Sequence, residues 1–418
     1  MKRTKRFLAF VLAACMIFGM LPALSASAEE GEAASSNFME VVGSGTSSYL
    51  STVGSNAFNV LMYNNTFSGV FGDQHMGGIE LSLNGMRIAT NGDLHMLPTP
   101  EQWDATPAPS RGTPVLDQAN ATITIPMTFS GSPDGVLKYD LVAKSIDGGV
   151  CMEMILRSEM PADLIGKARF NLEFRPASYR NKSYQADLNA DGVYDSFGVF
   201  PLHPQDEMIE TERPNLPSQA WYVKEWNTDR GDDQPAPFAT AYGFAFSPED
   251  DETAIDIEAA NGDLLELYDG RNRAQNGWYV LSTLIAATKP GDVAIAWNIR
   301  PHVKEGWVRD PNVGFSQVGY SPYQEKFAVV ELDKWDNNYP KTMALYRVNA
   351  DGSEEVVCEK ELGETTNWMR FKYARFLYPG YFCQDGERTG ATATDIGGDP
   401  TIHECQPRRC AGDQPQAL

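Results

Sequence analysis

The sequence predicts an all-β protein in which a large amino-terminal β-sandwich is followed by a small, incomplete β-sandwich. Two observations lead to this prediction. Short segments in which apolar and polar residues alternate recur along the chain, and turn-forming residues separate them. The 418 residues include 36 Gly and 26 Pro but only 22% charged residues, a composition typical of turn-rich sheet proteins. A chain of this length predicts two or three domains, each large enough to bury its own core.

The first 28 residues are typical of a secretory signal peptide. Four cations precede a short apolar run over residues 7–24, and small residues at 26–28 form a cleavage site. Residues 29–37 follow as a small-residue linker. No later segment approaches the apolar length of a bilayer span. We therefore expect a secreted, extracellular protein with no membrane partner.

The chain is strongly acidic, with a formal net charge of −22. Loss of the four cations of the leader leaves 30 basic against 56 acidic residues, a net charge of −26. A surface of this sign repels phosphate backbones, so nucleic acid is not an expected partner.

Residues 38–308 are expected to form one large β-sandwich, with two smaller sandwiches as the alternative. Alternating segments predict strands at residues 58–63, 78–83, 121–129, 135–142 and 150–157. Asn-Gly and Asp-Gly dipeptides favour tight reversals between strands. They occur at residues 84–85, 91–92, 134–135, 147–148, 191–192, 261–262, 269–270 and 351–352.

The alternation breaks between residues 94 and 117, where five prolines surround Trp103. Proline cannot donate a hydrogen bond to a sheet, so this segment is predicted to be a long surface loop. Loops of this length are often functional. Trp103 is a candidate for stacking on a sugar ring, and the alternative is a tryptophan that pins the loop to the core.

Residues 187–195 carry the pattern of a short calcium loop. Oxygen-bearing side chains stand at positions one, three, five and nine, with a glycine at six and a backbone carbonyl at seven, as a hard cation requires. Gly198 occupies position twelve, where an EF-hand has a glutamate, so the loop is more similar to the calcium loops between strands of integrin propellers. The alternative is a turn held by Asx side chains without an ion. The expected Ca²⁺ ligands are Asp187, Asn189, Asp191, the carbonyl of Val193, and Asp195.

Residues 205–234 combine acidic and aromatic side chains at high density. Sugars present apolar C–H faces and hydroxyl groups, which flat aromatic rings and carboxylates bind. In an extended chain Tyr222 and Trp226 share one face, whereas Trp221 lies on the other. Tyr222 and Trp226 are therefore candidate carbohydrate-binding residues, and Trp221 is expected in the core.

The same segment offers a catalytic alternative. A glycosidase needs two carboxylates, one as acid and one as nucleophile or base. The spacing of the acidic residues singles out no pair, so the region of Glu207, Glu210 and Glu225 is retained as an alternative active site.

Residues 268–279 form a second candidate ligand loop. Arg271 and Arg273 lie close in sequence to Trp278 and could hydrogen-bond sugar hydroxyls beside its ring. The alternative is that these groups satisfy the backbone atoms of a long turn.

Residues 313–333 carry the most specific sequence signal. The sequence QVGYSP at 317–322, followed by Lys326 and FAVV at 327–330, resembles the opening of the immunoglobulin-like module that precedes the catalytic barrel in family-nine glycoside hydrolases. Most members of that family are bacterial endoglucanases, which cut β-1,4-glucan. The similarity covers roughly residues 312–375. A proline turn joins two expected strands here, and alternation places Ala328, Val330 and Leu332 on one face.

The resemblance implies a cellulase-like parent enzyme that acts on β-glucan or another plant polysaccharide. Its catalytic barrel would start with an Asp-Ala-Gly-Asp motif, but residues 394–399 resemble that motif only faintly and lack helical surroundings. Residues 376–418 lose the strand alternation and are expected to be an irregular tail, and our hypothesis is that this tail is out of frame. We therefore expect a carbohydrate-binding or accessory sandwich and a truncated immunoglobulin-like module, with the missing barrel as intramolecular partner.

Overall fold

The computed structural model confirms the all-β prediction. Antiparallel strands dominate the described residues, whose one α-helix is the four-residue α2 (Pro176–Tyr179). No helix among these residues is long and apolar enough to cross a bilayer. The structure describes residues 37–63, 78–99, 109–204, 208–209, 234–273, 277–304, 306–316, 318–321, 324–368, 370–378, 383–384 and 387–388.

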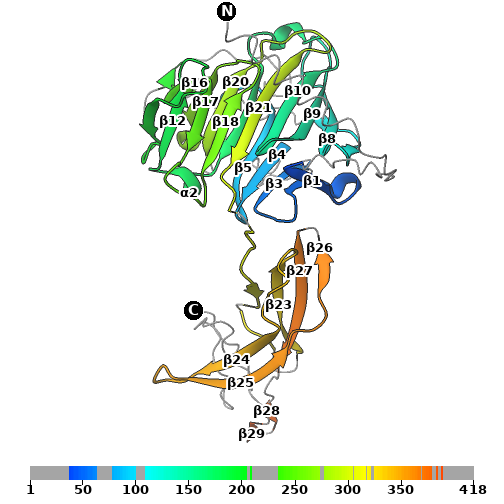
Figure 1. Cartoon of the computed structure of the whole chain (residues 1–418), viewed down its shortest axis with the longest axis vertical. Coiled ribbons are helices and arrows are strands. Elements are labelled where there is room, and N and C mark those ends of the chain that lie inside the picture. Colours follow the sequence, from blue (N-terminus) through cyan, green and yellow to red (C-terminus); the bar gives the residue numbers. More distant parts are fainter. Residues whose placement is uncertain are drawn as a thin grey trace, which may run out of the picture. The chain divides into compact units, whose positions relative to one another are not determined.

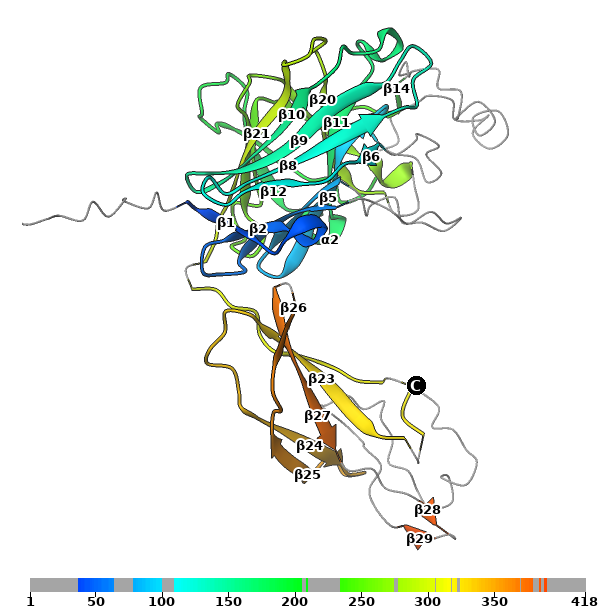
Figure 2. The same ribbon diagram turned by 90° about the vertical axis from the view of Figure 1, so that its right-hand side faces the viewer.

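Two large antiparallel sheets form the layers of a sandwich (Figure 1). The nine-stranded sheet has the order β1 (Met39–Val42), β2 (Tyr49–Thr52), β3 (Phe58–Tyr63), β4 (Gly78–Leu83), β5 (Met86–His95), β11 (Arg169–Phe174), β20 (Tyr279–Leu284), β19 (Leu265–Asp269) and β16 (Ala239–Ala241). The ten-stranded sheet has β13 (Ser196–Val199), β12 (Ser183–Asp187), β17 (Gly243–Phe246), β18 (Ile255–Ala259), β21 (Val293–Pro301), β10 (Gly149–Leu156), β9 (Leu137–Ile146), β8 (Thr122–Phe129) and β6 (Ser110–Arg111), and β7 (Val115–Asp117) also pairs with β8. Figure 2 shows both layers from a second direction.

Several short elements accompany the two large sheets. A two-stranded ladder pairs β14 (Met208–Ile209) with β15 (Gln234–Pro235). Single 3₁₀ turns occur at η1 (Gly45–Ser47), η2 (Ala162–Leu164) and η4 (Gly270–Asn272).

One continuous hydrophobic core fills the space between the two large sheets. Trp297 of β21 is fully buried and meets Phe170 of β11 edge to face, with ring centroids 5.1 Å apart. A second aromatic group lies beside α2, where the ring of Phe246 lies 5.0 Å from both Phe174 and Phe200. Each such pair adds about 0.5–1.5 kcal/mol beyond the burial of its surface. These contacts fix the two layers face to face.

The Asn84-Gly85 reversal is confirmed, whereas that at Asn91-Gly92 is wrong. Asn84 and Gly85 have φ of 48° and 74° and join β4 to β5 as a tight hairpin. Asn91, with φ of 60°, instead lies inside β5, where the registers with both neighbouring strands shift. The positive φ here accommodates an extra residue in a β-bulge. Asp269-Gly270 is also no tight reversal, because Gly270 opens η4.

A smaller set of sheets follows in the chain. Its residues pack around a separate core, in which the predicted face of Ala328, Val330 and Leu332 is buried. Phe376 pairs with Ala328 and fills the same core, so the strand that begins at Phe371 runs past residue 375 to Tyr378. The four-stranded sheet has the order β22 (Asn312–Gly314), β23 (Lys326–Asp333), β27 (Phe371–Tyr378) and β26 (Thr366–Trp368), and two hairpins pair β24 (Thr342–Val348) with β25 (Glu354–Glu361) and β28 (Cys383–Gln384) with β29 (Glu387–Arg388).

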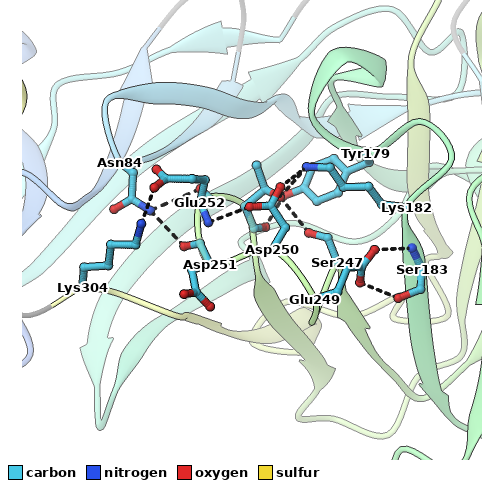
Figure 3. Close-up of polar contacts among 11 residues, drawn as sticks. Asn84, Tyr179, Lys182, Ser183, Ser247, Glu249, Asp250, Asp251, Glu252 and Lys304 are labelled. Carbon is cyan, nitrogen blue, oxygen red and sulfur yellow. Dashed lines mark hydrogen bonds and ion pairs between the residues drawn. The ribbon is translucent and has the colours of Figure 1, made fainter.

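A polar cluster ties the two large sheets together at one end of the sandwich (Figure 3). The amide of Asn84, from the β4–β5 turn, donates to the carbonyls of Asp251 and Glu252 at 3.3 and 3.2 Å. Lys182 donates to the Asp250 carboxylate and, at 2.9 Å, to the hydroxyl of Thr253. The acidic turn at 247–253 is thus held by side chains from other elements and serves as a structural clamp.

Candidate functional site

Buried polar side chains line the face of the nine-stranded sheet that points away from the core. In β11 the residues Phe170, Leu172 and Phe174 belong to the core, so Asn171 and Glu173 lie on the opposite face. Both are 0% exposed. Buried polar groups of this kind are more informative than buried apolar ones, because each one must be satisfied or is costly.

The same alternation in the neighbouring strands defines what we call the polar face. In β4 the core residues Ile79, Leu81 and Leu83 leave Glu80 and Ser82 on the outside. Strand pairing sets Ser82 opposite Arg87, and Thr90 opposite Glu173. The polar face comprises Glu80, Ser82, Arg87, Thr90, Asn91, Arg169, Asn171, Glu173, Arg175, Glu266, Tyr268, Trp278 and Ser282.

One half of the polar face is a chain of hydrogen bonds across β11, β20 and β19. The hydroxyl of Ser282 donates to Asn171 Oδ1 at 2.6 Å and accepts from Arg169 Nε at 2.7 Å. Arg169 also forms an ion pair with Glu266, which accepts the hydroxyl of Tyr268 at 2.9 Å. Burial raises the pKa of Tyr268, so its hydroxyl stays protonated as a donor. Hydrogen bonds and one ion pair thus connect all five side chains of this half.

The other half lies across β4, β5 and β11. The bulge turns Asn91 so that its amide donates to Glu173 Oε1 at 2.6 Å. Arg87 reaches Glu80 at 3.5 Å, and its guanidinium carbon lies 5.5 Å from the centre of the Trp278 ring. An arginine at this distance from a tryptophan forms a cation–π contact.

Two hydroxyl groups on this half are buried without a hydrogen-bond partner. Ser82 is 1% exposed and Thr90 is 0% exposed, and neither Oγ atom finds a donor or acceptor. Buried hydroxyls are nearly always paired in folded proteins. The two oxygens therefore mark a place where the protein offers unused hydrogen-bonding capacity.

The structure places the residues of the predicted 268–279 ligand loop in different roles. Trp278 is half-buried and lies on the polar face next to Arg87. Arg271 donates to both carboxylate oxygens of Asp269, at 2.8 and 2.6 Å, and to the carbonyl of Pro201 at 2.7 Å. Arg273 is buried. Arg271 thus contacts a carboxylate of its own loop and a carbonyl outside it, and carbohydrate binding by Arg271 and Arg273 stays a prediction.

The remaining carbohydrate and catalytic candidates lie outside the described residues. These are Trp103, Tyr222, Trp226, Glu207, Glu210 and Glu225.

The predicted calcium loop is closed by its own backbone. The carboxylate of Asp187 accepts the N–H groups of Asn189 and Gly192 at 3.0 and 2.8 Å, and Asp191 Oδ1 accepts that of Val193 at 2.9 Å. Burial opposes ionisation of Asp187, but these backbone donors hold its pKa below the ordinary value. In the described part of the chain no three His, Cys, Asp or Glu side chains are grouped to hold a metal. Calcium binding, including the part expected of Asp195, stays a prediction.

Sequence reasoning did not single out the polar face. Alternating polar residues in a strand are ordinarily assigned to solvent, and residues 169–174 were not distinguished from other strands on that basis. The available signal was the kind of residue. Arg169, Asn171 and Glu173 place a guanidinium, an amide and a carboxylate in one short strand, where an exposed strand commonly carries Thr or Lys.

The fold defines this chain as an all-β sandwich protein, and comparison with known proteins does not narrow that class. No protein-family model and no curated protein matches the chain. Among solved structures the chain is similar to a mutant of the heparan sulfate lyase HepC from Pedobacter heparinus, with 8% identity and a TM-score of 0.25. The match covers 74% of this chain and 39% of the lyase chain, so the chain spans less than half of that protein.

Proposed function

We propose that this chain is a secreted polysaccharide-binding protein whose large sandwich holds a glycan on the polar face. The observation that carries the proposal is the chemistry of that face. Arg87 and Trp278, both partly exposed, lie on this face together with the buried polar side chains of Ser82, Thr90 and Glu173. Sugar sites combine flat rings with a few fixed polar groups in this way.

The finer part of the proposal concerns the parent enzyme. The resemblance of residues 312–375 to the immunoglobulin-like module of family-nine glycoside hydrolases supports a cellulase-like protein that degrades β-1,4-glucan. On this proposal the sandwich has an accessory, glycan-binding role, and hydrolysis belongs to a catalytic barrel.

Affinity electrophoresis of the whole secreted chain tests the binding function. We expect gels that contain hydroxyethylcellulose or barley β-glucan to retard the protein, and Trp278→Ala to lose most of the retardation. Trp368→Ala is the matched control, because Trp368 is an exposed tryptophan of β26, outside the nine-stranded sheet. If none of the soluble glucans changes the mobility, the proposed function is wrong.

A reducing-end assay on the same samples tests the catalytic alternative. The binding proposal predicts no sugar release. If the wild type releases reducing sugar and Glu207→Gln, Glu210→Gln or Glu225→Gln does not, the chain is a hydrolase with its active site in this region.

A further inference from the structure

We propose that the polar face takes an uncharged glycan and recognises its hydroxyl groups through Ser82 and Thr90. This inference rests on the proposed function and adds to it the class of ligand and the position of a subsite. The subsite lies where β4, β5 and β11 adjoin, between the Arg87–Trp278 pair and Glu173.

The charge balance of the polar face disfavours an acidic ligand. Its carboxylates, Glu80, Glu173 and Glu266, are matched in number by its three guanidinium groups. Two of these arginines already face carboxylates, Arg87 with Glu80 and Arg169 with Glu266. A uronate or sulfate group is recognised by arginines that can turn a bidentate fork towards it.

The third guanidinium, that of Arg175, reaches the backbone carbonyl of Arg87 at 3.4 Å. Its charge only balances that of the third carboxylate, so the face has no net positive charge. The chain as a whole carries a net charge of −22, which adds a long-range repulsion of polyanions. An uncharged polymer meets neither obstacle.

The two hydroxyl groups explain how an uncharged ligand is held. Ser82 and Thr90 each have one donor and two acceptor positions, and none is used inside the protein. A sugar hydroxyl also donates and accepts, so it can pair with either group without bringing a charge. The bound state then satisfies two polar atoms that the free protein leaves unpaired, which favours binding.

Access of a ligand to the Ser82 hydroxyl depends on the position of the Arg87 side chain. Its side chain is 30% exposed and lies opposite Ser82, whereas Ser82 itself is buried. Movement of the guanidinium would open the way to the Ser82 hydroxyl. Ser82 then supplies a hydrogen-bonding position of the subsite on the same face as Trp278.

The substitutions Thr90→Val and Ser82→Ala separate ligand recognition from folding. Thr90→Val keeps the shape of the side chain but removes an unpaired buried hydroxyl, so the melting temperature should be unchanged or higher. The dissociation constant for hydroxyethylcellulose should rise about three- to tenfold, the effect of one lost hydrogen bond. A residue with only a structural role would not combine unchanged stability with weaker binding.

Thr124→Val is the matched control, since Thr124 is a half-buried threonine of β8 in the ten-stranded sheet. The full secreted chain and the three variants are run in gels with hydroxyethylcellulose, polygalacturonate or dextran sulfate. We expect retardation by the uncharged polymer alone, reduced in Thr90→Val and Ser82→Ala and intact in Thr124→Val.

Each other result has a defined meaning. Equal retardation by the acidic polymers overturns the inference of an uncharged ligand, and unchanged binding in both hydroxyl variants overturns the subsite. Either result leaves glycan binding itself standing. Absence of retardation by every polymer overturns the proposed function.

Discussion

Asp93 and Tyr139 form a buried pair between elements of the two large sheets. The Tyr139 hydroxyl donates to Asp93 Oδ1 at 2.6 Å, and the backbone N–H of Leu94 donates to the same oxygen at 2.7 Å. Burial raises the pKa of Asp93 despite these two donors, and it also raises the pKa of Tyr139. The folded protein therefore favours the neutral form of both side chains.

Asp93 should make the stability of the sandwich depend on pH. Because the folded pKa is higher than the unfolded value near 3.8, the carboxyl stabilises the fold below that value, and the contribution is lost as pH rises through the folded pKa. Asp93→Asn should remove this loss, so its melting temperature should gain on the wild type as pH rises from 4 to 7. A constant difference across that range would contradict the prediction.

Tyr139→Phe is the companion variant to Asp93→Asn. It leaves the Asp93 carboxyl buried with one donor fewer, and we expect it to cost about 1–3 kcal/mol of unfolding free energy at pH 7. Urea unfolding measured at pH 7 checks this value.

At the scale of single residues, the sequence made Trp278 a candidate binding residue but gave no sign of which side chains lie around it. The register between β5 and β11 brings Thr90 beside Glu173, although the two residues are far apart in the chain. No local pattern reports such a pairing, because it depends on which strands become neighbours. The orientation of Asn91 depends on the bulge as well, and an Asn-Gly pair is equally typical of a turn.

Among the elements, the turn at 247–253 depends on the ion pair between Lys182 and Asp250. The hydrogen bond from Lys182 is the main cause of the lowered pKa of Asp250. A lowered pKa means that this stabilisation is present above the unfolded pKa and is lost as pH falls through the folded pKa.

Replacement of Lys182 tests this clamp. Lys182→Met should cost roughly 0.2–1 kcal/mol at pH 7, the range of partly exposed ion pairs, and less at pH 3. Lys304→Met removes the more exposed pair with Glu252 and should have a smaller effect. Thermal unfolding at both pH values measures the difference, and a larger effect of Lys182→Met at the lower pH would refute the assignment.

Two variants of the loop at 187–195 distinguish a calcium site from a turn that is held by Asx side chains without an ion. Asp187→Ala should lower stability with or without an ion, because three backbone N–H groups lose their acceptor. Asp195 is exposed, so Asp195→Ala should leave the melting temperature unchanged in EDTA. If calcium binds, millimolar Ca²⁺ raises the melting temperature of the wild type but not of Asp195→Ala. An equal melting temperature with Ca²⁺ and with EDTA in the wild type indicates the ion-free turn.

Strands were largely predictable at the scale of elements, because alternation is a local property. The predicted strands at residues 58–63 and 78–83 coincide with β3 and β4. The order of strands within each sheet could not be read in the same way. β11 lies between β5 and β20, and this arrangement is set by packing between segments distant in the sequence.

The described residues form two separate hydrophobic cores of unequal size. The smaller core has few fully buried side chains, and small cores are marginally stable. We therefore expect two thermal transitions by calorimetry, with the smaller core unfolding first.

Core substitutions assign each transition. Phe376→Ala should lower only the first transition and Phe170→Ala only the second, each by about 3–5 kcal/mol of unfolding free energy. A single transition that both variants shift equally would show that the two cores unfold together.

The bulge at Asn91 limits which sequence changes β5 can accept in evolution. An extra residue in β5 sets its two halves out of phase, so the side chains before and after it do not follow one alternation. Deletion of the extra residue would restore a regular register between β5 and β11 and remove the amide that contacts Glu173. A deletion at another position of β5 would exchange the inner and outer faces of part of the strand, so we expect the surface around Glu173 to diversify mainly by substitution.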